Sequence, residues 1–418
     1  MRGVRGIRIA VVGGSIAGCA AALAAHRGGV GEIVVYERAV DRPTDRGVGL
    51  VMHNSRHGEL SSQGYLGTDT PWVQLTRRRW YVRDGLSSLG REVAVTPFPF
   101  RTYTWGPLWH ELRRRVPDSA QFRPGTTVTG IDITPEGAEL TAGSEGRAEH
   151  FDLVIGADGY RSVVRRAVCP DLRPEYAGYL AWRGAFPADR LTDPAAWADE
   201  DCVFAVFPGG QLTAFRIPDG AGGHRVNWVL FTTPPTRLDL ALNDPTSLPP
   251  GTVTEALHTH LTEIADTHLP PYWGELVGLT APDELFIQPL YDFTAPQYTT
   301  DRLLLMGDAA TVARPHTGAG TVKALQDATA LESALTTHPG SLADALRTYD
   351  ADRSAAGRTM VDLGRSLGQA LVQEAPDWGA MDQSALDTWC QQADGGGALG
   401  GLKLPRTVSE RRAQSETP

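Results

Sequence analysis

The stretch Leu303–Lys323, LLLMGDAATVARPHTGAGTVK, organises the rest of the chain. Its apolar run Leu303–Met306 is typical of a buried strand, which Gly307-Asp308 ends. Gly318–Gly320 then opens a helix. The first N–H groups of a helix have no partner within it, so this helix start directs donors towards an electron-rich group. The stretch therefore predicts a strand–turn–helix unit that holds a ligand.

A second turn of this kind lies near the N-terminus. The expected strand Ile7–Val12 is followed by Gly13-Gly14-Ser15-Ile16-Ala17-Gly18 and a helix of small residues, and Glu37 stands 19 residues beyond Gly18. A glycine-rich turn with a carboxylate at this distance is typical of a dinucleotide-binding unit, in which the helix start binds the pyrophosphate and the carboxylate binds the ribose. Ser15 replaces the usual middle glycine, so a turn without function stays the alternative.

Composition favours a globular enzyme with two domains. The 418 residues are 41% hydrophobic and 21% charged, which is ordinary for such a protein. The net charge of −10 opposes binding to nucleic acid or to an anionic membrane. Only Lys323 and Lys403 among the 39 basic residues are lysine, which indicates a compositional bias. Most arginine clusters are therefore expected to be solvated faces.

The N-terminal sequence and the cysteines indicate in which cellular compartment the protein lies. Ile16–Cys19 imitates a lipoprotein cleavage site, but the run contains Gly13-Gly14 and continues into a βαβ pattern, which favours a nucleotide loop. No apolar segment is long enough to span a bilayer. The four cysteines are scattered, so we expect neither a disulfide framework nor a metal site, and we predict a cytoplasmic protein.

A separate antiparallel sheet is expected between the two turns. Four strand patterns with turn signals between them lie at Tyr179–Phe186, Cys202–Phe207, Leu212–Ile217 and Val226–Thr233. We therefore predict an α/β fold: a Rossmann-like domain, an inserted antiparallel β-sheet domain for the substrate, and C-terminal helices. The expected boundaries are 1–75, 100–175 and 283–375 for the Rossmann-like domain, 76–99 and 176–282 for the substrate domain, and 376–418 for a C-terminal helix and mobile tail.

Three motifs, taken in order, resemble a known family. They are Gly13–Gly18 with Glu37, GADGYRSVVR at Gly156–Arg165, and Leu304–Gly320. Together they resemble the single-component FAD-dependent aromatic hydroxylases, the para-hydroxybenzoate hydroxylase family, over residues 7–375. Arg314–Thr317, with the sequence RPHT, is similar to the 2,6-dihydroxypyridine hydroxylase branch. The resemblance implies that the Rossmann-like domain binds FAD and that NAD(P)H is the reductant.

The resemblance also implies which residues hold FAD. The first loop would bind its pyrophosphate, Glu37 its adenosine ribose and Asp308 its ribityl chain. Pro315 would pack beside the isoalloxazine ring, and the helix start at Gly318–Gly320 would stabilise negative charge on that ring. The expected cofactor contacts are Gly13, Ser15, Ala17, Gly18, Glu37, Arg38, Arg46, Gly49, Leu50, Val128, Asp158, Asp308, Pro315, Gly318, Ala319 and Gly320. Trp105 stands where many members carry an arginine, which leaves one flavin contact open.

The implied reaction is the hydroxylation of an electron-rich aromatic or heteroaromatic small molecule. NAD(P)H would reduce FAD, O2 would give a C4a-hydroperoxyflavin, and the ring would take up the distal oxygen. An ionised substrate needs a base or an acceptor, so His53 and His316 are the expected catalytic candidates, with Pro315 beside the ring. Each histidine has a structural alternative, His53 at a helix entry and His316 as a hydrogen-bond partner.

The antiparallel sheet is expected to cover the flavin ring. Strand alternation predicts that one parity of side chains faces the ring, but not which parity. The candidate substrate contacts are Tyr179, Ala181, Phe204, Phe215 and Trp228. The expected partners are a small aromatic substrate and O2, with no nucleic acid and no membrane, and a homodimer stays open.

Other functions compete with aromatic hydroxylation. An epoxidase or a Baeyer–Villiger oxygenase would use the same fold and cofactor, and a non-catalytic protein could bind flavin and a pathway intermediate. A flavin-dependent halogenase is disfavoured, because it is expected to carry a catalytic lysine early in the chain and the first lysine here is Lys323.

Overall fold

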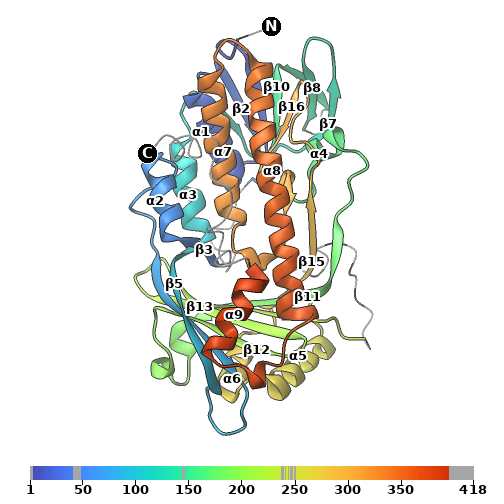
Figure 1. The fold of residues 1–418 in the computed structure, drawn as a ribbon. Coiled ribbons are helices and arrows are strands. Elements are labelled where there is room, and N and C mark those ends of the chain that lie inside the picture. The colour runs from blue at the N-terminus through green and yellow to red at the C-terminus, as the bar shows by residue number, and fades with distance from the viewer. Residues whose placement is uncertain are drawn as a thin grey trace.

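The computed structural model describes residues 3–40, 49–143, 146–236 and 251–394, together with the isolated positions 240, 242, 244 and 248. Two large sheets lie at opposite ends of the molecule, and long helices run between them (Figure 1). The predicted contact Arg46 and the predicted tail beyond residue 394 lie outside the described residues.

A five-stranded parallel sheet forms one end, in the order β16-β10-β1-β2-β6. Its strands are β1 (Arg8–Val12), β2 (Glu32–Tyr36), β6 (Gln121–Arg123), β10 (Leu153–Gly156) and β16 (Leu303–Leu305). Helices and a small sheet cover its two faces, so the strands are short, largely apolar runs except for the edge strand β6. The covering elements are α1 (Ile16–Arg27), α3 (Trp105–Arg115), α4 (Val163–Val168), α7 (Gly320–Thr337), β7 (Val128–Ile133), β8 (Ala138–Ala142) and β9 (Arg147–Phe151).

The turn between β1 and α1 explains the first glycine motif. Gly13 has a φ of +100°, and a Cβ on it would lie 2.4 Å from the carbonyl oxygen of Ala157. A Cβ on Gly18 would lie 1.8 Å from the carbonyl oxygen of Gly13. Only glycine therefore fits at either position. The same packing brings the second motif, which follows β10, against the first.

A nine-stranded sheet forms the other end, in the order β17-β15-β11-β14-β13-β12-β4-β5-β3. All neighbours are antiparallel except β4 and β12, which are parallel. The strands are β3 (Gly49–His53), β4 (Val73–Val82), β5 (Arg91–Thr104), β11 (Glu175–Pro187), β12 (Asp201–Phe207), β13 (Gly210–Pro218), β14 (His224–Thr232), β15 (Phe286–Thr294) and β17 (Thr311–Val312). Since β3 and β15 come from segments assigned to the Rossmann-like domain, sheet membership alone does not divide the chain, and the domain boundaries stay a prediction.

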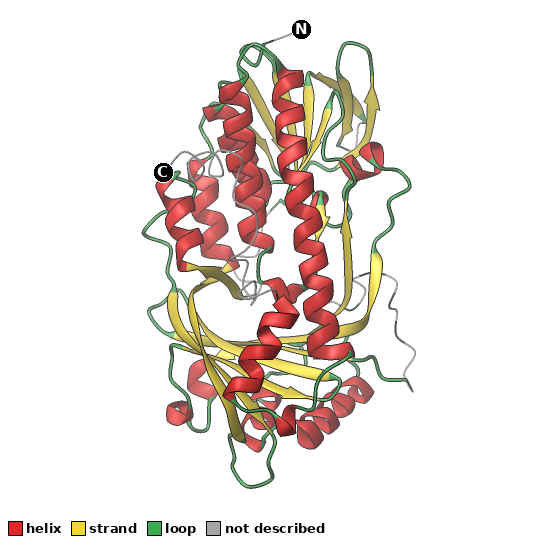
Figure 2. Cartoon of the chain, in the orientation of Figure 1, coloured by secondary structure: helices red, strands yellow, loops and turns green. Residues whose placement is uncertain are grey.

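The two faces of the nine-stranded sheet have different neighbours. One face packs on α5 (Glu255–His268) and α6 (Pro271–Gly278), below the curved sheet in Figure 2. The other face turns towards the long helix α8 (Leu342–Gly368) and the C-terminal helix α9 (Gln383–Asp394). A short helix, α2 (Asn54–Ser62), follows β3. None of the helices in the described ranges combines the length and the apolar character that a membrane crossing requires.

Candidate active site

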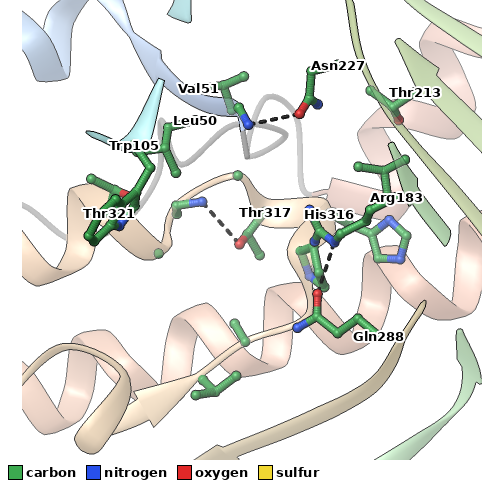
Figure 3. Close-up of a pocket in the computed structure, with 18 of the residues that line it drawn as sticks. Leu50, Val51, Trp105, Arg183, Thr213, Asn227, Gln288, His316, Thr317 and Thr321 are labelled. Carbon is green, nitrogen blue, oxygen red and sulfur yellow. Dashed lines mark hydrogen bonds between the residues drawn. The ribbon is translucent and has the colours of Figure 1, made fainter. Parts of the chain in front are cut away.

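A cavity of about 460 Å³ lies between the turns of the parallel sheet and one face of the nine-stranded sheet. Its volume is in the range of small-molecule sites. Figure 3 shows how three separate parts of the chain supply its wall, with Leu50 and Val51 from β3, Arg183 from β11, and His316 and Thr317 from the segment before α7. The opening stretch of the sequence analysis therefore lines the cavity.

Many of the predicted cofactor contacts meet on one side of this cavity. They are Ser15, Ala17, Gly49, Leu50, Asp308, Pro315, Gly318, Ala319 and Gly320. Trp105, at the start of α3, lines the same side. Gly49 is fixed to the nine-stranded sheet, because its N–H donates to the Asn227 side chain at 2.8 Å. This hydrogen bond joins β3 to β14 within the nine-stranded sheet, at the cavity.

Two helix starts open into the cavity. The helix α1 begins after Ser15 and α7 begins after Ala319, and in the described structure neither N-cap residue caps its helix with a side chain. The first N–H groups of both helices are therefore available to a ligand with negative or electron-rich groups. The Asp308 carboxylate beside them can accept hydrogen bonds from hydroxyl groups. These residues fit FAD, which carries a diphosphate, a hydroxylated chain and an electron-poor ring.

Other predicted cofactor contacts lie behind or beside this wall. Glu37 is buried at the end of β2 and accepts from the N–H of Gly14 at 2.7 Å and from the N–H of Ala39 at 3.0 Å. Arg38 is exposed. Val128, on β7, packs against the core. Gly13 and Gly18 shape the turn but are not on the cavity wall.

Asp158 lies between two residues of the cavity wall, Ala157 and Gly159. Its carboxylate accepts from the N–H of Val163 at 2.6 Å at the start of α4. Burial raises the pKa of this carboxyl. In this structure the side chain caps a helix next to the cavity.

The sheet side of the cavity is aromatic. Phe204 and Phe215, both predicted, line it together with Phe98 and Phe231. Tyr179 and Ala181 are buried on the same face of the sheet, beyond the cavity wall. The prediction for Trp228 does not fit the structure, because this side chain lies on the opposite face and donates from Nε1 to Thr280 at 2.8 Å. On β14 the odd-numbered side chains face the cavity, so Trp228 is no longer a substrate candidate.

The two histidine candidates have different surroundings. His316 lines the cavity, and its Nε2 lies 2.8 Å from the hydroxyl oxygen of Tyr179. Burial, followed by the charges of Arg314 and Arg183, lowers the pKa of His316 to about 3, so the imidazole is neutral. His53 does not line the cavity; it caps α2, accepting from the N–H of Ser55 at 3.1 Å. His53 therefore has the structural role given as its alternative, at the entry of a helix, rather than a place in the cavity.

Sequence reasoning missed two cationic side chains on the sheet side. Arg183 lines the cavity and donates from Nε to Gln288 at 3.0 Å, and burial lowers its pKa to about 10. Arg78 lines the cavity with its guanidinium 4.1 Å from the centre of the Phe98 ring and 4.5 Å from that of Phe204. Among the described residues of the wall, Asp308 is the only acid.

Strand alternation within β4 could have identified Arg78. Arg77 and Arg79 both pair with Asp201, with Nε–O distances of 2.7 Å. The side chain between them must then point to the other face. The expectation that arginine clusters are solvated faces therefore fails at the middle residue of Arg77–Arg79. Arg314, the first residue of the RPHT motif, pairs with Asp292, with 2.8 Å between Nε and Oδ2.

Comparisons with known proteins place this geometry in a family. A family model described as an FAD binding domain matches residues 108–364. The chain belongs to this FAD-binding family. A 3-amino-4-hydroxybenzoate 2-monooxygenase of Streptomyces cremeus is 30% identical over 362 residues, which cover 84% of each chain. A 2,6-dihydroxypyridine 3-monooxygenase of Paenarthrobacter nicotinovorans is 28% identical over 79% of this chain and 83% of its own. The enzyme is thus an FAD-dependent monooxygenase of the aromatic hydroxylase type, as the motifs predict.

Solved structures show the same fold. The 2,6-dihydroxypyridine-3-hydroxylase from Arthrobacter nicotinovorans superposes with a TM-score of 0.77 at 24% identity, covering 97% of this chain and 98% of its own. Klebsiella pneumoniae HpxO, in complex with FAD and uric acid, gives a TM-score of 0.72 at 21% identity, covering 94% of each chain. The predicted fold class, with its Rossmann-like domain, antiparallel sheet and C-terminal helices, is confirmed.

Proposed function

We propose that this enzyme uses FAD, NAD(P)H and O2 to hydroxylate a small aromatic ring that carries an anionic group. The observation that carries the proposal is the presence of two arginines, Arg78 and Arg183, among aromatic, polar and aliphatic side chains on the sheet side of the cavity. The only acid among the described residues of the wall, Asp308, belongs to the expected cofactor contacts. A buried guanidinium binds a carboxylate or a phenolate strongly, because each contact is a charge-assisted hydrogen bond. Two relatives are named for hydroxylated rings, and one of these rings is a benzoate.

The aromatic walls explain how a ring would be held. Phe204, Phe215 and Phe231 are each at most 7% exposed, and they offer apolar faces to a flat substrate. A substrate ring that packs against these side chains would displace water from that side of the cavity, which protects reactive oxygen species from wasteful breakdown. The phenylalanines would therefore define the shape of the substrate site, while the arginines would orient the anionic group.

The opposite wall would hold FAD. Asp308 would accept from the ribityl hydroxyls, the N–H groups at the starts of α1 and α7 would face the electron-rich atoms of the cofactor, and Pro315 would pack beside the ring. When bound, FAD supplies the chemistry of O2 activation. His316 is neutral and hydrogen-bonded to Tyr179, and its pKa is lowered to about 3. It would therefore hydrogen-bond to a hydroxyl group of the substrate ring and fix the position of that group, rather than act as the base that removes its proton.

Matched probes test the proposed substrate class. The purified enzyme would be given 3-amino-4-hydroxybenzoate, its neutral carboxamide, or 2,6-dihydroxypyridine, while NAD(P)H oxidation and products are followed. We expect the acid to have a KM at least about 10-fold lower than its carboxamide, which is the difference of one or two charge-assisted hydrogen bonds. Arg183→Gln should remove that difference. Product analysis also separates hydroxylation from epoxidation and from Baeyer–Villiger oxidation.

Arg79→Gln is a matched control, because Arg79 lies on β4 next to Arg78 but pairs with Asp201 away from the cavity. This variant should keep the preference for the acid. Equal KM values for the acid and the carboxamide in the wild type would contradict an anionic substrate, while leaving hydroxylation itself intact.

Three expectations about partners and location stay part of this proposal. They are a homodimer, the absence of nucleic-acid and membrane partners, and a cytoplasmic location. The net charge of −10 supports the second. Light scattering on the purified FAD complex would measure the oligomeric state directly.

A further inference from the structure

We propose that Lys323 is a positioning residue, which fixes the orientation and charge of Asp308 and thereby sets the affinity for FAD. The inference rests on the proposed assignment of Asp308 to the ribityl chain. Lys323 is the one lysine of the part of the chain that the structure describes, although the sequence has 39 basic residues. It is 1% exposed, lies on the first turn of α7, and does not line the cavity, whereas Asp308 does.

Lys323 and Asp327 hold the backbone that leads into Asp308. The Nζ of Lys323 donates to the carbonyl oxygen of Gly307 at 3.2 Å and to Oδ2 of Asp327 at 2.7 Å. The same Oδ2 accepts from the N–H of Gly307 at 2.8 Å. The peptide groups on both sides of Gly307 are therefore bonded to one ion pair. Asp308 is the next residue, so its direction is set by this pair.

The hydrogen bonds of Lys323 and Asp327 to Gly307 also bear on the contact between two loops that would hold the cofactor. Gly307 has a φ of +57°, and a Cβ on it would lie 2.9 Å from the Cβ of Ala17, which lines the cavity from the first turn of α1. The residue Gly307, shortly after β16, therefore packs closely against the start of α1, which follows the glycine-rich turn. A change at Lys323 would loosen the contact between the loop that carries Asp308 and the loop that faces the pyrophosphate.

The charges around Asp308 make the ammonium group important. From α7, Asp308 faces Lys323 and Asp327. From α8, Arg353 donates to the other oxygen of Asp327 at 2.7 Å, and the hydroxyl of Tyr349 donates to the carbonyl of Leu305. Two further groups complete the surroundings: the ring of Tyr298, 4.8 Å from Nζ of Lys323, and Arg165 of α4, which donates to the carbonyl of Ala309 at 3.2 Å.

These neighbours act on Asp308 in opposite directions. Burial raises the pKa of its carboxyl, Lys323 lowers it, and Asp327 raises it. The Asp308 side chain is exposed to the cavity, so water in the cavity screens both effects in part. Without Lys323, the Asp327 carboxylate would oppose ionisation of Asp308 with no ammonium group beside it. A protonated Asp308 has lost part of its capacity to accept from hydroxyl groups.

The chemistry of lysine suits this position. An ammonium group is a compact point charge with three donors, whereas a guanidinium is a wide planar fork. The geometry uses two of these donors, one on a carbonyl and one on a carboxylate. The compact ammonium group therefore fits both acceptors within a fully buried site.

The test measures FAD affinity of the apo-protein between pH 5 and 9, from the quenching of flavin fluorescence. Lys323→Gln keeps a hydrogen-bond donor but removes the charge. We expect it to raise the Kd for FAD by about 10-fold or more at pH 7. Because FAD binding needs the ionised carboxylate, affinity falls as the pH falls through the pKa of Asp308. The variant should move that fall to higher pH, because the Lys323 ammonium lowers the pKa of Asp308 in the wild type.

Two further variants separate positioning from general stability. Arg353→Gln also removes a cation from Asp327 but does not touch Gly307, so it should lower the melting temperature without moving the pH midpoint of FAD binding. Lys323→Arg restores the charge and should restore the midpoint, even if packing lowers the melting temperature. A midpoint that follows the melting temperature across all three variants would overturn the proposal.

A double-mutant cycle with Asp308→Asn identifies the route of the effect. If Lys323 acts through Asp308, then Lys323→Gln should change the Kd by less than about 3-fold in the Asp308→Asn background. Equal fold-changes in both backgrounds would overturn the inference. If Asp308→Asn weakens FAD binding while no Lys323 variant does, only the role of Lys323 fails. If Asp308→Asn has no effect, the ribityl assignment itself fails.

Discussion

His316 is close to the proposed substrate, yet its environment disfavours the charged imidazolium. The ring packs 4.2 Å from the centre of Phe231, bonds to Tyr179 at Nε2, and lies near the charges of Arg314 and Arg183. A neutral imidazole with one nitrogen already bonded can offer its other nitrogen to the cavity. The residue therefore suits the recognition of a ring hydroxyl better than the removal of its proton.

This environment predicts the charge state of His316. Its pKa is lowered to about 3, so the ring should stay neutral from pH 5 to 9 and gain a proton only below that range. NMR of histidine-labelled protein, with His316→Asn to assign the signal, would measure this. A His316 signal that titrates near pH 6.5 would contradict the account, and the imidazole would then be a candidate for a base.

The side chains of strand β14 have different roles on the two faces of the sheet. Asn227, Val229 and Phe231 face the cavity, whereas Trp228 and Leu230 pack towards α5 and α6. The alternation of a β-strand causes this division, and the register of β14 with β11 and β13 fixes which parity faces the cavity. Function and stability should therefore be separable at adjacent positions.

A pair of substitutions on β14 tests the division. Val229→Phe should narrow the cavity and raise the KM of an aromatic substrate by about 10-fold, with a small change in melting temperature. Trp228→Ala should lower the free energy of unfolding by about 3–5 kcal/mol, because it empties a fully buried site, while KM changes little in the fraction that stays folded. Thermal melts and steady-state kinetics of both variants provide the measurement. A large KM effect from Trp228→Ala alone would contradict the assignment of faces.

At the scale of the whole molecule, the sequence predicts the cofactor side far better than the substrate side. The turns after β1 and β16 carry local signals, because glycine, a carboxylate and a helix start lie within a few residues of one another. The chain then needs only the parallel pairing of β1, β10 and β16 to bring them together. The motif around Asp308 therefore predicts the cofactor side of the cavity from local sequence alone.

The substrate side depends on contacts between distant segments. Arg78 reaches the cavity because β4 pairs with β12, more than 100 residues later, and this parallel pairing has no local signal. Arg183 stands next to Trp182, and only the register of β11 shows that the arginine rather than the tryptophan faces the ligand. Which side chains of a strand face the cavity depends on the pairing of distant strands. The wrong prediction for Trp228 and the omission of both arginines therefore have the same cause.

In the proposed reaction, one atom of O2 is transferred to an aromatic ring inside the cavity between the two sheets. The most direct measurement is the reaction of the FAD-loaded enzyme with NAD(P)H and 3-amino-4-hydroxybenzoate under ¹⁸O2, with mass spectrometry of the product. We predict one ¹⁸O atom in a ring hydroxyl for each NAD(P)H consumed, and loss of this product in Arg183→Gln at low substrate concentration. Oxidation of NAD(P)H that yields only H2O2, with this acid and with hydroxypyridines, phenols and indoles all recovered unchanged, would contradict it.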